Sequence, residues 1–226
     1  MTQRSALLVG ASGLVGGNCL DVLLQTEEYE RVVILTRRPL LLEHPKLEEH
    51  VVDFDRLDDA APLMNADDVF CCLGTTIRAA GSQSEFKKVD FTYTVQVGAI
   101  AVRNGADQLL VVTSLGANPK SKIFYNRIKG ETEEALAKLP CESIHFFRHS
   151  LLLGNRKESR RGEKAGIAAM RAFSLLMAGP LKNYRPIEAN VVARAMVLTA
   201  LSNQSGVIIH ESDQIRSISA AAVRHL

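Results

Sequence analysis

Short apolar runs alternate with helical patterns along most of this 226-residue chain. Nearly every residue in these runs is apolar, so both faces of the strands they predict must be covered by helices, as in a parallel sheet. The pattern therefore predicts a doubly wound α/β fold, in which ligands bind beyond the carboxyl ends of the strands. The predicted strands are residues 5–10, 31–36, 50–53, 68–73, 108–114, 143–148 and 206–210, and the clearest helices are 14–25, 84–104 and 126–138.

No linker or internal repeat divides the chain, although the alternation weakens in its last third. One domain is expected over residues 1–226, in which residues 150–205 form a small substrate-side lobe. Residues 154–164 carry five basic and two acidic residues, which predicts a solvated loop or else a lid over an anionic ligand. Residues 165–181 are apolar almost all round, which predicts a buried helix or else a pocket wall or dimer surface.

Composition and charge exclude several classes of protein. A net charge of +2 gives no argument for nucleic-acid binding, and no segment has the roughly 20 uninterrupted apolar residues of a membrane span. The histidines and the four cysteines show no metal-ligand spacing, so no metal is expected. Free thiols and a start unlike a signal peptide predict a reducing compartment, the cytoplasm.

Three glycines stand between the first predicted strand and the first predicted helix, in the sequence "GASGLVG". Gly10 ends the strand, Gly13 allows the backbone to approach a pyrophosphate, and Gly16 allows the helix to pack close to the sheet. The free N–H groups at the helix start then face the phosphates. The cofactor contacts predicted in this loop are Gly10, Ser12, Gly13, Leu14, Val15 and Gly16.

The end of the second predicted strand indicates which dinucleotide binds. A site for NAD usually has an acidic residue there to hold the ribose hydroxyls. This chain has Thr36, Arg37 and Arg38 instead. Two guanidinium groups suit a 2′-phosphate, which favours NADP over the alternative of two solvated arginines before a turn.

The ends of the third and fourth predicted strands extend the cofactor site. Asp53 is expected either to bind near the adenine, with Phe54 beside it, or to cap the following helix. The nicotinamide ribose is expected beside Leu73, Gly74, Thr75 and Thr76.

Three further residues carry the predicted chemistry. Tyr125 and Lys129 are four residues apart and share one face of a helix, and Ser114 closes the fifth predicted strand. A free tyrosine has a pKa of about 10, and an adjacent ammonium favours its phenolate form. We expect Tyr125 to exchange a proton with the substrate, Ser114 to hold the carbonyl oxygen, and Lys129 to tune Tyr125. Lys129 and Tyr125 are also expected to contact the cofactor.

The motifs "GASGLVG", "CLGTT", "VTSLGA", "YNRIKG" and "FFRHSLLLGNR" resemble atypical, extended-type members of the short-chain dehydrogenase/reductase superfamily. The nearest subgroup is the Tat-interacting-protein-like oxidoreductases. The resemblance is good over residues 5–150 and implies an NADP-binding Rossmann domain with Ser114, Tyr125 and Lys129 in the catalytic positions. Many members have a catalytic asparagine where this chain has Asp90, which therefore either replaces it or is structural.

The sequence thus predicts an NADP(H)-dependent oxidoreductase that interconverts a carbonyl and an alcohol on a small molecule. The alternatives are an NADPH-sensing binding protein without turnover and an epimerase or dehydratase that uses its cofactor transiently. Arg148 ends the sixth predicted strand, where it either binds an acidic substrate group or pairs with a carboxylate. The predicted helices 84–104 and 126–138 could pair with those of a second copy, so a homodimer is a further expectation.

Overall fold

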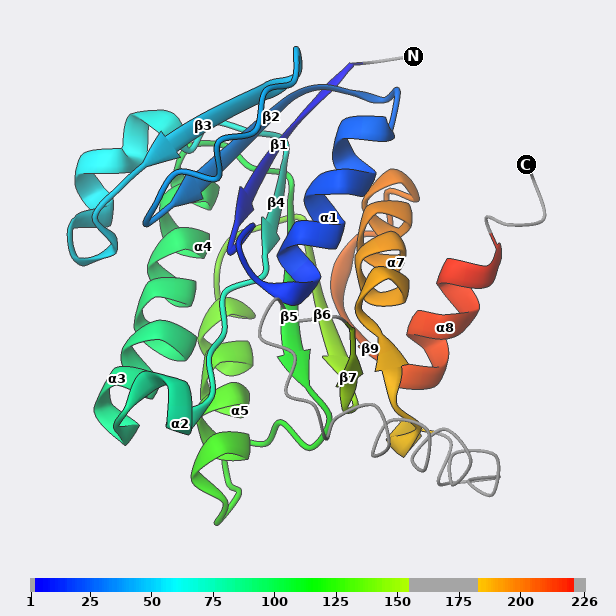
Figure 1. Ribbon diagram of the computed structural model, residues 1–226. Coiled ribbons are helices and arrows are strands. Elements are labelled where there is room, and N and C mark those ends of the chain that lie inside the picture. The colour runs from blue at the N-terminus through cyan, green and yellow to red at the C-terminus, as the bar shows by residue number, and fades with distance from the viewer. Residues whose placement is uncertain (1–2, 155–182, 222–226) are drawn as a thin grey trace, which may run out of the picture.

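The central element of the computed structural model is a parallel sheet with the strand order β3-β2-β1-β4-β5-β6-β9 (Figure 1). The structure describes residues 3–154 and 183–221. Within these residues a second, two-stranded sheet pairs β7 (Leu152–Leu153) with β8 (Ile187–Glu188). The strands of the central sheet are β1 (Arg4–Val9), β2 (Tyr29–Thr36), β3 (Leu47–Val51), β4 (Asp68–Cys71), β5 (Gln108–Ser114), β6 (Ser143–His149) and β9 (Gly206–Glu211).

Helices cover both faces of this sheet (Figure 1). On one face, α1 (Leu14–Gln25), α7 (Ala189–Leu201) and α8 (Ser212–Ala221) pack on one core cluster. On the other face, η1 (Phe54–Leu63), α4 (Thr94–Arg103) and α5 (Phe124–Leu136) pack on a second cluster. Because successive residues of a strand point to opposite faces, the apolar runs of β1 and β5 feed both cores. The predicted doubly wound α/β class is confirmed.

The predicted helix 84–104 is not one continuous α-helix. It consists of α3 (Gln83–Lys87), a π-helical segment η2 (Lys88–Tyr93) and α4, and the short helix α2 (Ile77–Ala80) precedes it. The wider π-turn changes which side chains face inward, and it buries Asp90 to 1% exposure. The segments 154–164 and 165–181 lie, except for Gly154, outside the described residues, so the predicted lobe stays a prediction.

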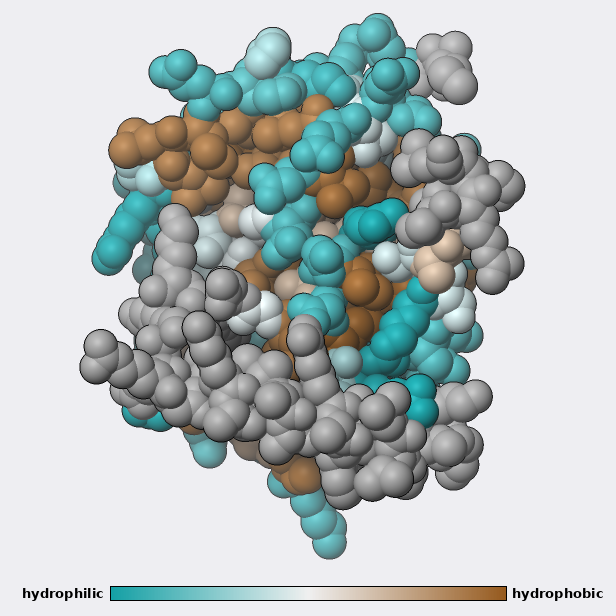
Figure 2. Space-filling model, turned by 45° about the vertical axis from the view of Figure 1, so that its right-hand side comes forward, coloured by the Kyte–Doolittle hydropathy of each residue, from teal (hydrophilic) through white to brown (hydrophobic). Residues whose placement is uncertain are grey.

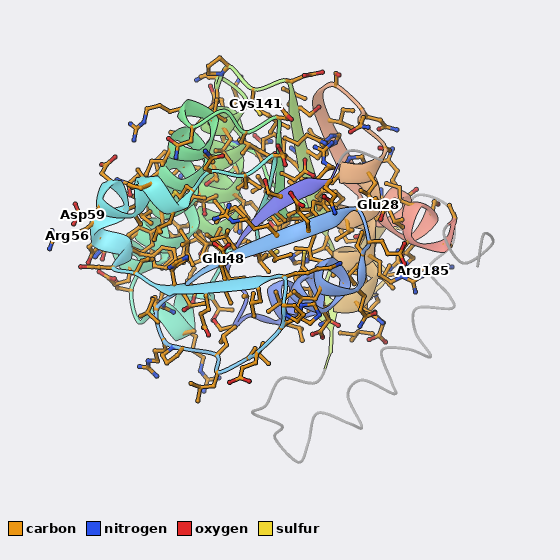
Figure 3. All side chains as sticks on the ribbon, turned by 90° about the horizontal axis from the view of Figure 1, so that it is seen from above. Glu28, Glu48, Arg56, Asp59, Cys141 and Arg185 are labelled. Atoms are coloured by element: carbon orange, nitrogen blue, oxygen red, sulfur yellow. The ribbon has the colours of Figure 1, made fainter. Side chains whose placement is uncertain are left out.

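A polar cluster joins the neighbouring strands β2, β1 and β4 at their amino ends. The Asp68 carboxylate accepts hydrogen bonds from Arg4 Nε at 2.7 Å and from the Tyr29 hydroxyl at 2.6 Å. In Figure 3, seen from above, Glu28 and Cys141 mark the loops that lead into β2 and β6 on this side. The carboxyl ends of the strands are thereby left for a ligand site.

Several apolar side chains remain on the surface. Leu41 and Leu42, which follow β2, are 85% and 50% exposed, and Val207 and Ile209 are exposed on the edge strand β9. Figure 2 shows hydrophobic atoms gathered across the upper part of one face. Such surface is compatible with the predicted homodimer, which stays a prediction.

Two buried histidines, His145 on β6 and His210 on β9, lie side by side. Nδ1 of His145 lies 3.0 Å from Nε2 of His210, and Nε2 of His145 lies 3.1 Å from the Gln204 carbonyl oxygen. Burial lowers the pKa of both rings, to about 4 for His210, whose pKa the neighbouring His145 lowers further. Unfolded histidines have pKa values near 6.5, so the unfolded chain gains protons first as the pH falls.

We therefore expect the free energy of unfolding to fall as the pH drops below 6.5, by up to roughly 1.4 kcal/mol per pH unit for each histidine, and for His210 this fall continues to about pH 4. Urea unfolding across this range measures the slope. The variant His210→Gln should flatten it. A slope equal to that of the wild type would contradict a role for the pair.

Candidate functional site

The glycine loop takes its shape from two close backbone approaches. Gly10 has φ +87°, and a Cβ there would lie 2.5 Å from the Cys72 carbonyl oxygen. A Cβ on Gly16 would lie 2.1 Å from the Gly10 carbonyl oxygen. Gly13 is the N-cap of α1 and makes no side-chain cap hydrogen bond. The backbone N–H groups at the start of α1 are therefore available to an anion.

A cavity of about 260 Å³ opens at the carboxyl ends of β1, β2 and β4. The glycine loop, Arg37 and the loop after β4 line it, which brings together segments far apart in the chain. Predicted residues on its wall are Gly10, Ser12, Gly13, Thr36, Arg37, Phe54, Leu73, Gly74 and Thr75. Those off the wall are Leu14, Val15, Gly16, Arg38, Asp53, Thr76, Tyr125 and Lys129. Wall residues that the sequence analysis missed are Ala11, Leu35, Cys72, Ala79, Ala80, Glu85, Val89 and Tyr93.

The structure separates the two arginines after β2. Both Arg37 and Arg38 are exposed, but only Arg37 lies on the cavity wall. Thr36 is buried, and its hydroxyl lies 3.4 Å from the Glu49 carboxylate, which also accepts from the Leu40 amide at 2.6 Å. Glu49 thus holds the turn that carries Arg37 and Arg38.

Asp53 and Phe54 have different surroundings. The Asp53 carboxylate accepts a hydrogen bond from the Asp55 amide at 2.9 Å and caps η1, which is the second of the two predicted alternatives. Phe54 is buried on the cavity wall, where its ring centroid lies 5.6 Å from that of Tyr93. The Tyr93 hydroxyl donates to Asp55 at 2.5 Å, so it is fixed in place. Nothing in the sequence indicated that Tyr93, inside the predicted helix 84–104, lines this cavity, because the π-turn decides which way its side chain faces.

Asp90 connects the cavity wall to the helix that carries the predicted catalytic pair. Its Oδ1 forms an ion pair with Lys129 Nζ at 2.7 Å, and its Oδ2 accepts from the Thr75 amide at 2.9 Å. Both side chains are buried, and a Cβ added at Gly74 would lie within 4 Å of each. The Thr132 hydroxyl donates to the Asp90 carbonyl oxygen at 3.0 Å. Asp90 therefore fixes the position of Lys129 relative to the β4 loop.

The ion pair also keeps Lys129 charged. Burial by itself lowers the pKa of Lys129, but the charges of Asp90 and Tyr125 outweigh this effect and raise it above its ordinary value. Tyr125 lies one turn before Lys129 on α5, is half-buried, and packs its ring 5.3 Å from that of Phe86. Tyr125 and Lys129 thus lie one turn apart on α5.

Ser114 ends β5 at the same edge of the sheet. It is 6% exposed, and its hydroxyl has no hydrogen-bond partner among the described residues. A buried hydroxyl without a partner is uncommon in folded proteins and is typical of positions that bind a ligand. Its predicted catalytic role, like those of Tyr125 and Lys129, stays a prediction.

Arg148 pairs with a carboxylate, which is the second of its two predicted alternatives. Its guanidinium contacts the Glu133 carboxylate at 2.5 Å, and the same carboxylate accepts from the Thr113 hydroxyl at 2.7 Å. The charge of Arg148 is thus already paired. Over the residues that the structure describes, no three or more metal-ligating side chains come together.

A parallel sheet with a glycine loop and a cavity at its carboxyl edge defines a Rossmann-type nucleotide-binding protein. Residues 6–220 match the model of the "NAD dependent epimerase/dehydratase family", and the chain belongs to that family. It is also an atypical, Tat-interacting-protein-like member of the short-chain dehydrogenase/reductase superfamily, as its likeness to Protein HTATIP2 of Rattus norvegicus supports. The two are 33% identical over 230 residues, which cover 100% of this chain and 90% of the rat protein.

Other relatives are fungal. Protein FMP52, mitochondrial, of Candida glabrata is 31% identical over 166 residues, 72% of this chain and 70% of its own length. Protein fmp52, mitochondrial, of Aspergillus clavatus is 30% identical over 220 residues, 94% of each chain. These relatives overturn the predicted cytoplasmic location, because their names place them in mitochondria. No helix in the described parts of the chain is long and apolar enough to cross a bilayer.

Solved structures share the fold at low sequence identity. The enzyme WbmH of Bordetella bronchiseptica, in complex with NAD⁺, has a TM-score of 0.70 and 15% identity, covering 98% of this chain and 81% of that one. MoeE5, in complex with UDP-glucose and NAD, has a TM-score of 0.67 and 18% identity, covering 97% of this chain and 82% of that one. Both support the doubly wound architecture.

Proposed function

We propose that this protein is an NADP(H)-dependent oxidoreductase that interconverts a carbonyl and an alcohol on a small organic molecule through Ser114, Tyr125 and Lys129. The observation that carries the proposal is the buried contact between Lys129 and Asp90, which also binds the Thr75 amide on the cavity wall. This contact fixes a charged lysine and its neighbour Tyr125 relative to the cofactor cavity. Chemistry at the cavity edge needs such fixed positions.

The residues of the cavity fit a nicotinamide dinucleotide. Side chains at Gly10 and Gly16 would collide with backbone atoms, so the loop stays tight, and α1 offers its free N–H groups to a pyrophosphate. The family description, which names NAD, supports a dinucleotide as the cofactor. When bound, the nicotinamide ring supplies the hydride that adds to the carbonyl carbon.

The protein's own residues supply the proton and the orientation. Ser114 donates a hydrogen bond to the carbonyl oxygen, and Tyr125 donates its phenolic proton to the same oxygen as the hydride adds. The carbonyl thereby becomes an alcohol, and a phenolate is left on Tyr125. Lys129, kept protonated beside Asp90, stabilises that phenolate through its charge. In the oxidising direction each step runs in reverse.

The choice of NADP over NAD depends on Arg37 in this proposal. Arg37 lies on the cavity wall and Arg38 does not, so a 2′-phosphate placed at the end of β2 would bind Arg37. We expect Arg37→Ala to weaken NADPH binding about tenfold or more and to leave NADH binding unchanged. Isothermal titration calorimetry with both nucleotides measures this.

Arg38→Ala is the matched control for that experiment. It removes the same charge from the next residue, and its effect on NADPH binding should be smaller than that of Arg37→Ala. Equal losses from both variants would mean that net charge, and not a bound 2′-phosphate, decides the affinity. A wild-type preference for NADH would refute the NADP assignment.

The family description favours a second candidate function, an epimerase or dehydratase that oxidises and re-reduces its substrate without net consumption of cofactor. The same tyrosine would then remove a proton first and return one later. Net formation of NADP⁺ with substrate distinguishes the two functions, because only an oxidoreductase accumulates oxidised cofactor.

A further inference from the structure

His149 lies beside Ser114 at the carboxyl edge of the sheet. The two residues are register partners in the parallel ladder between β5 and β6, and the Leu115 amide donates to the His149 carbonyl oxygen at 2.9 Å. Register partners on neighbouring parallel strands project from the same face, with their backbones about 4.8 Å apart. The imidazole and the Ser114 hydroxyl therefore stand next to each other.

The ring of His149 has a defined hydrogen-bonding state. Its Nδ1 lies 2.6 Å from the Ser150 carbonyl oxygen, which only accepts, so Nδ1 carries the proton and donates. Burial lowers the pKa of His149 to about 4, and the nearby charge of Lys129 lowers it as well. At neutral pH the ring is uncharged, and Nε2 has a free lone pair that accepts a hydrogen bond.

Among the described residues, the His149 ring makes its side-chain hydrogen bond through Nδ1. The Ser114 hydroxyl is buried and has no hydrogen-bond partner in the same residues. The Ser150 hydroxyl donates to the Arg185 carbonyl oxygen instead. Arg148, on the opposite face of β6, is paired with Glu133. The edge of the sheet thus offers one hydroxyl donor and, beside it, one imidazole acceptor.

We propose that His149 accepts a hydrogen bond from a hydroxyl on the carbon next to the reacting carbonyl, so that the preferred substrates are α-hydroxy carbonyl compounds and the corresponding vicinal diols. The inference rests on the proposed function, in which Ser114 holds the carbonyl oxygen. A simple ketone has no such hydroxyl to donate to Nε2 of His149, so its complex lacks this hydrogen bond.

The test compares hydroxyacetone with butanone, in which a methyl group replaces the hydroxyl. For the wild type, His149→Phe and His149→Gln, kcat and KM are measured with NADPH and each ketone. We expect His149→Phe to raise KM for hydroxyacetone about five- to tenfold and to leave the butanone values and the NADPH affinity unchanged. His149→Gln keeps an acceptor oxygen and should recover part of the loss.

A binding measurement separates this inference from the proposed function. The fluorescence of bound NADPH is followed while 1,2-propanediol or 2-butanol, the alcohols that correspond to the two ketones, is added, which requires no turnover. Weaker diol binding in His149→Phe supports His149 as the hydrogen-bond acceptor, even if the protein reduces neither ketone. Failure to reduce either ketone would refute only the proposed oxidoreductase function. If His149→Phe leaves both the diol affinity and the ratio of kcat/KM between hydroxyacetone and butanone unchanged, the proposed role of His149 is wrong. Thermal melting checks that each variant is folded.

Discussion

The variant Tyr125→Phe is expected to lose about 10²–10⁴-fold in kcat for carbonyl reduction and to keep its affinity for NADPH within about twofold. Phenylalanine keeps the ring that packs on Phe86 and removes only the hydroxyl. The proton for the carbonyl oxygen then has to come from water. Because Tyr125 is off the wall of the cofactor cavity, nucleotide binding should not depend on that hydroxyl. NADPH oxidation in the steady state and calorimetry measure the two quantities.

Tyr184→Phe is the matched control, since it removes the same group from an exposed tyrosine, 58% accessible, far along the chain. It should leave kcat unchanged. Activity of Tyr125→Phe within about threefold of wild type would show that another group delivers the proton, and the assignment of the catalytic site would be wrong.

The variant Gly16→Ala is expected to abolish dinucleotide binding. The new methyl group would lie 2.1 Å from the Gly10 carbonyl oxygen, and no change of side-chain packing relieves this contact, because the methyl group is fixed to the helix backbone and the atom it meets is itself backbone. Helix α1 has to move away from the loop, and its N–H groups no longer meet the phosphates. We expect at least a hundredfold loss of NADPH affinity, about 2.7 kcal/mol, together with a lower melting temperature.

Gly17→Ala is the neighbouring control. Its methyl group would meet the Ala11 carbonyl oxygen at 3.3 Å, which a small shift relieves, and alanine favours the helix by roughly 0.5–1 kcal/mol. This variant should bind NADPH nearly as the wild type does. If Gly16→Ala bound the nucleotide equally well, the loop would be a turn without a role in phosphate binding.

Local patterns were sufficient to predict the sheet and the glycine loop. The strand Gln108–Ser114 and the helix Leu14–Gln25 have the predicted bounds, because a continuous apolar run and an amphipathic run after glycine are properties of the local sequence. The other strands differ from their predicted bounds by one to three residues at an end. Cys72 and Leu73 leave the β4 ladder to line the cavity, and β3 runs over Leu47–Val51 and not over 50–53.

The contacts of Asp90 could not be predicted from the local pattern. A regular helix over 84–104 gives each side chain a face from its position, whereas the π-turn of Lys88–Tyr93 rotates the residues around it. That rotation buries Asp90 against Lys129 and turns Tyr93 to the cavity wall. Similarly, the pairing of Arg148 with Glu133 joins a strand to a helix, which spacing along the chain does not reveal.

Part of the predicted site lines the cavity, and the predicted catalytic residues lie outside its wall. Residues that bind phosphate and ribose in the proposal lie on one wall, whereas Tyr125 and Lys129 connect to it through Asp90. Asp90 forms a direct ion pair with Lys129, and its replacement of the asparagine found in many short-chain dehydrogenases stays a prediction. Asp90 is therefore a positioning residue in this account, which fixes the ammonium that acts on Tyr125.

The most direct test of the account is a hydride-transfer measurement with NADPH that carries deuterium at the transferable C4 position of its nicotinamide. The wild-type protein is incubated with this cofactor and hydroxyacetone, and the products are examined by mass spectrometry. The account predicts one deuterium bound to carbon in the 1,2-propanediol for each NADP⁺ formed. Altered substrate without accumulation of NADP⁺, or no binding of the nucleotide, would contradict it.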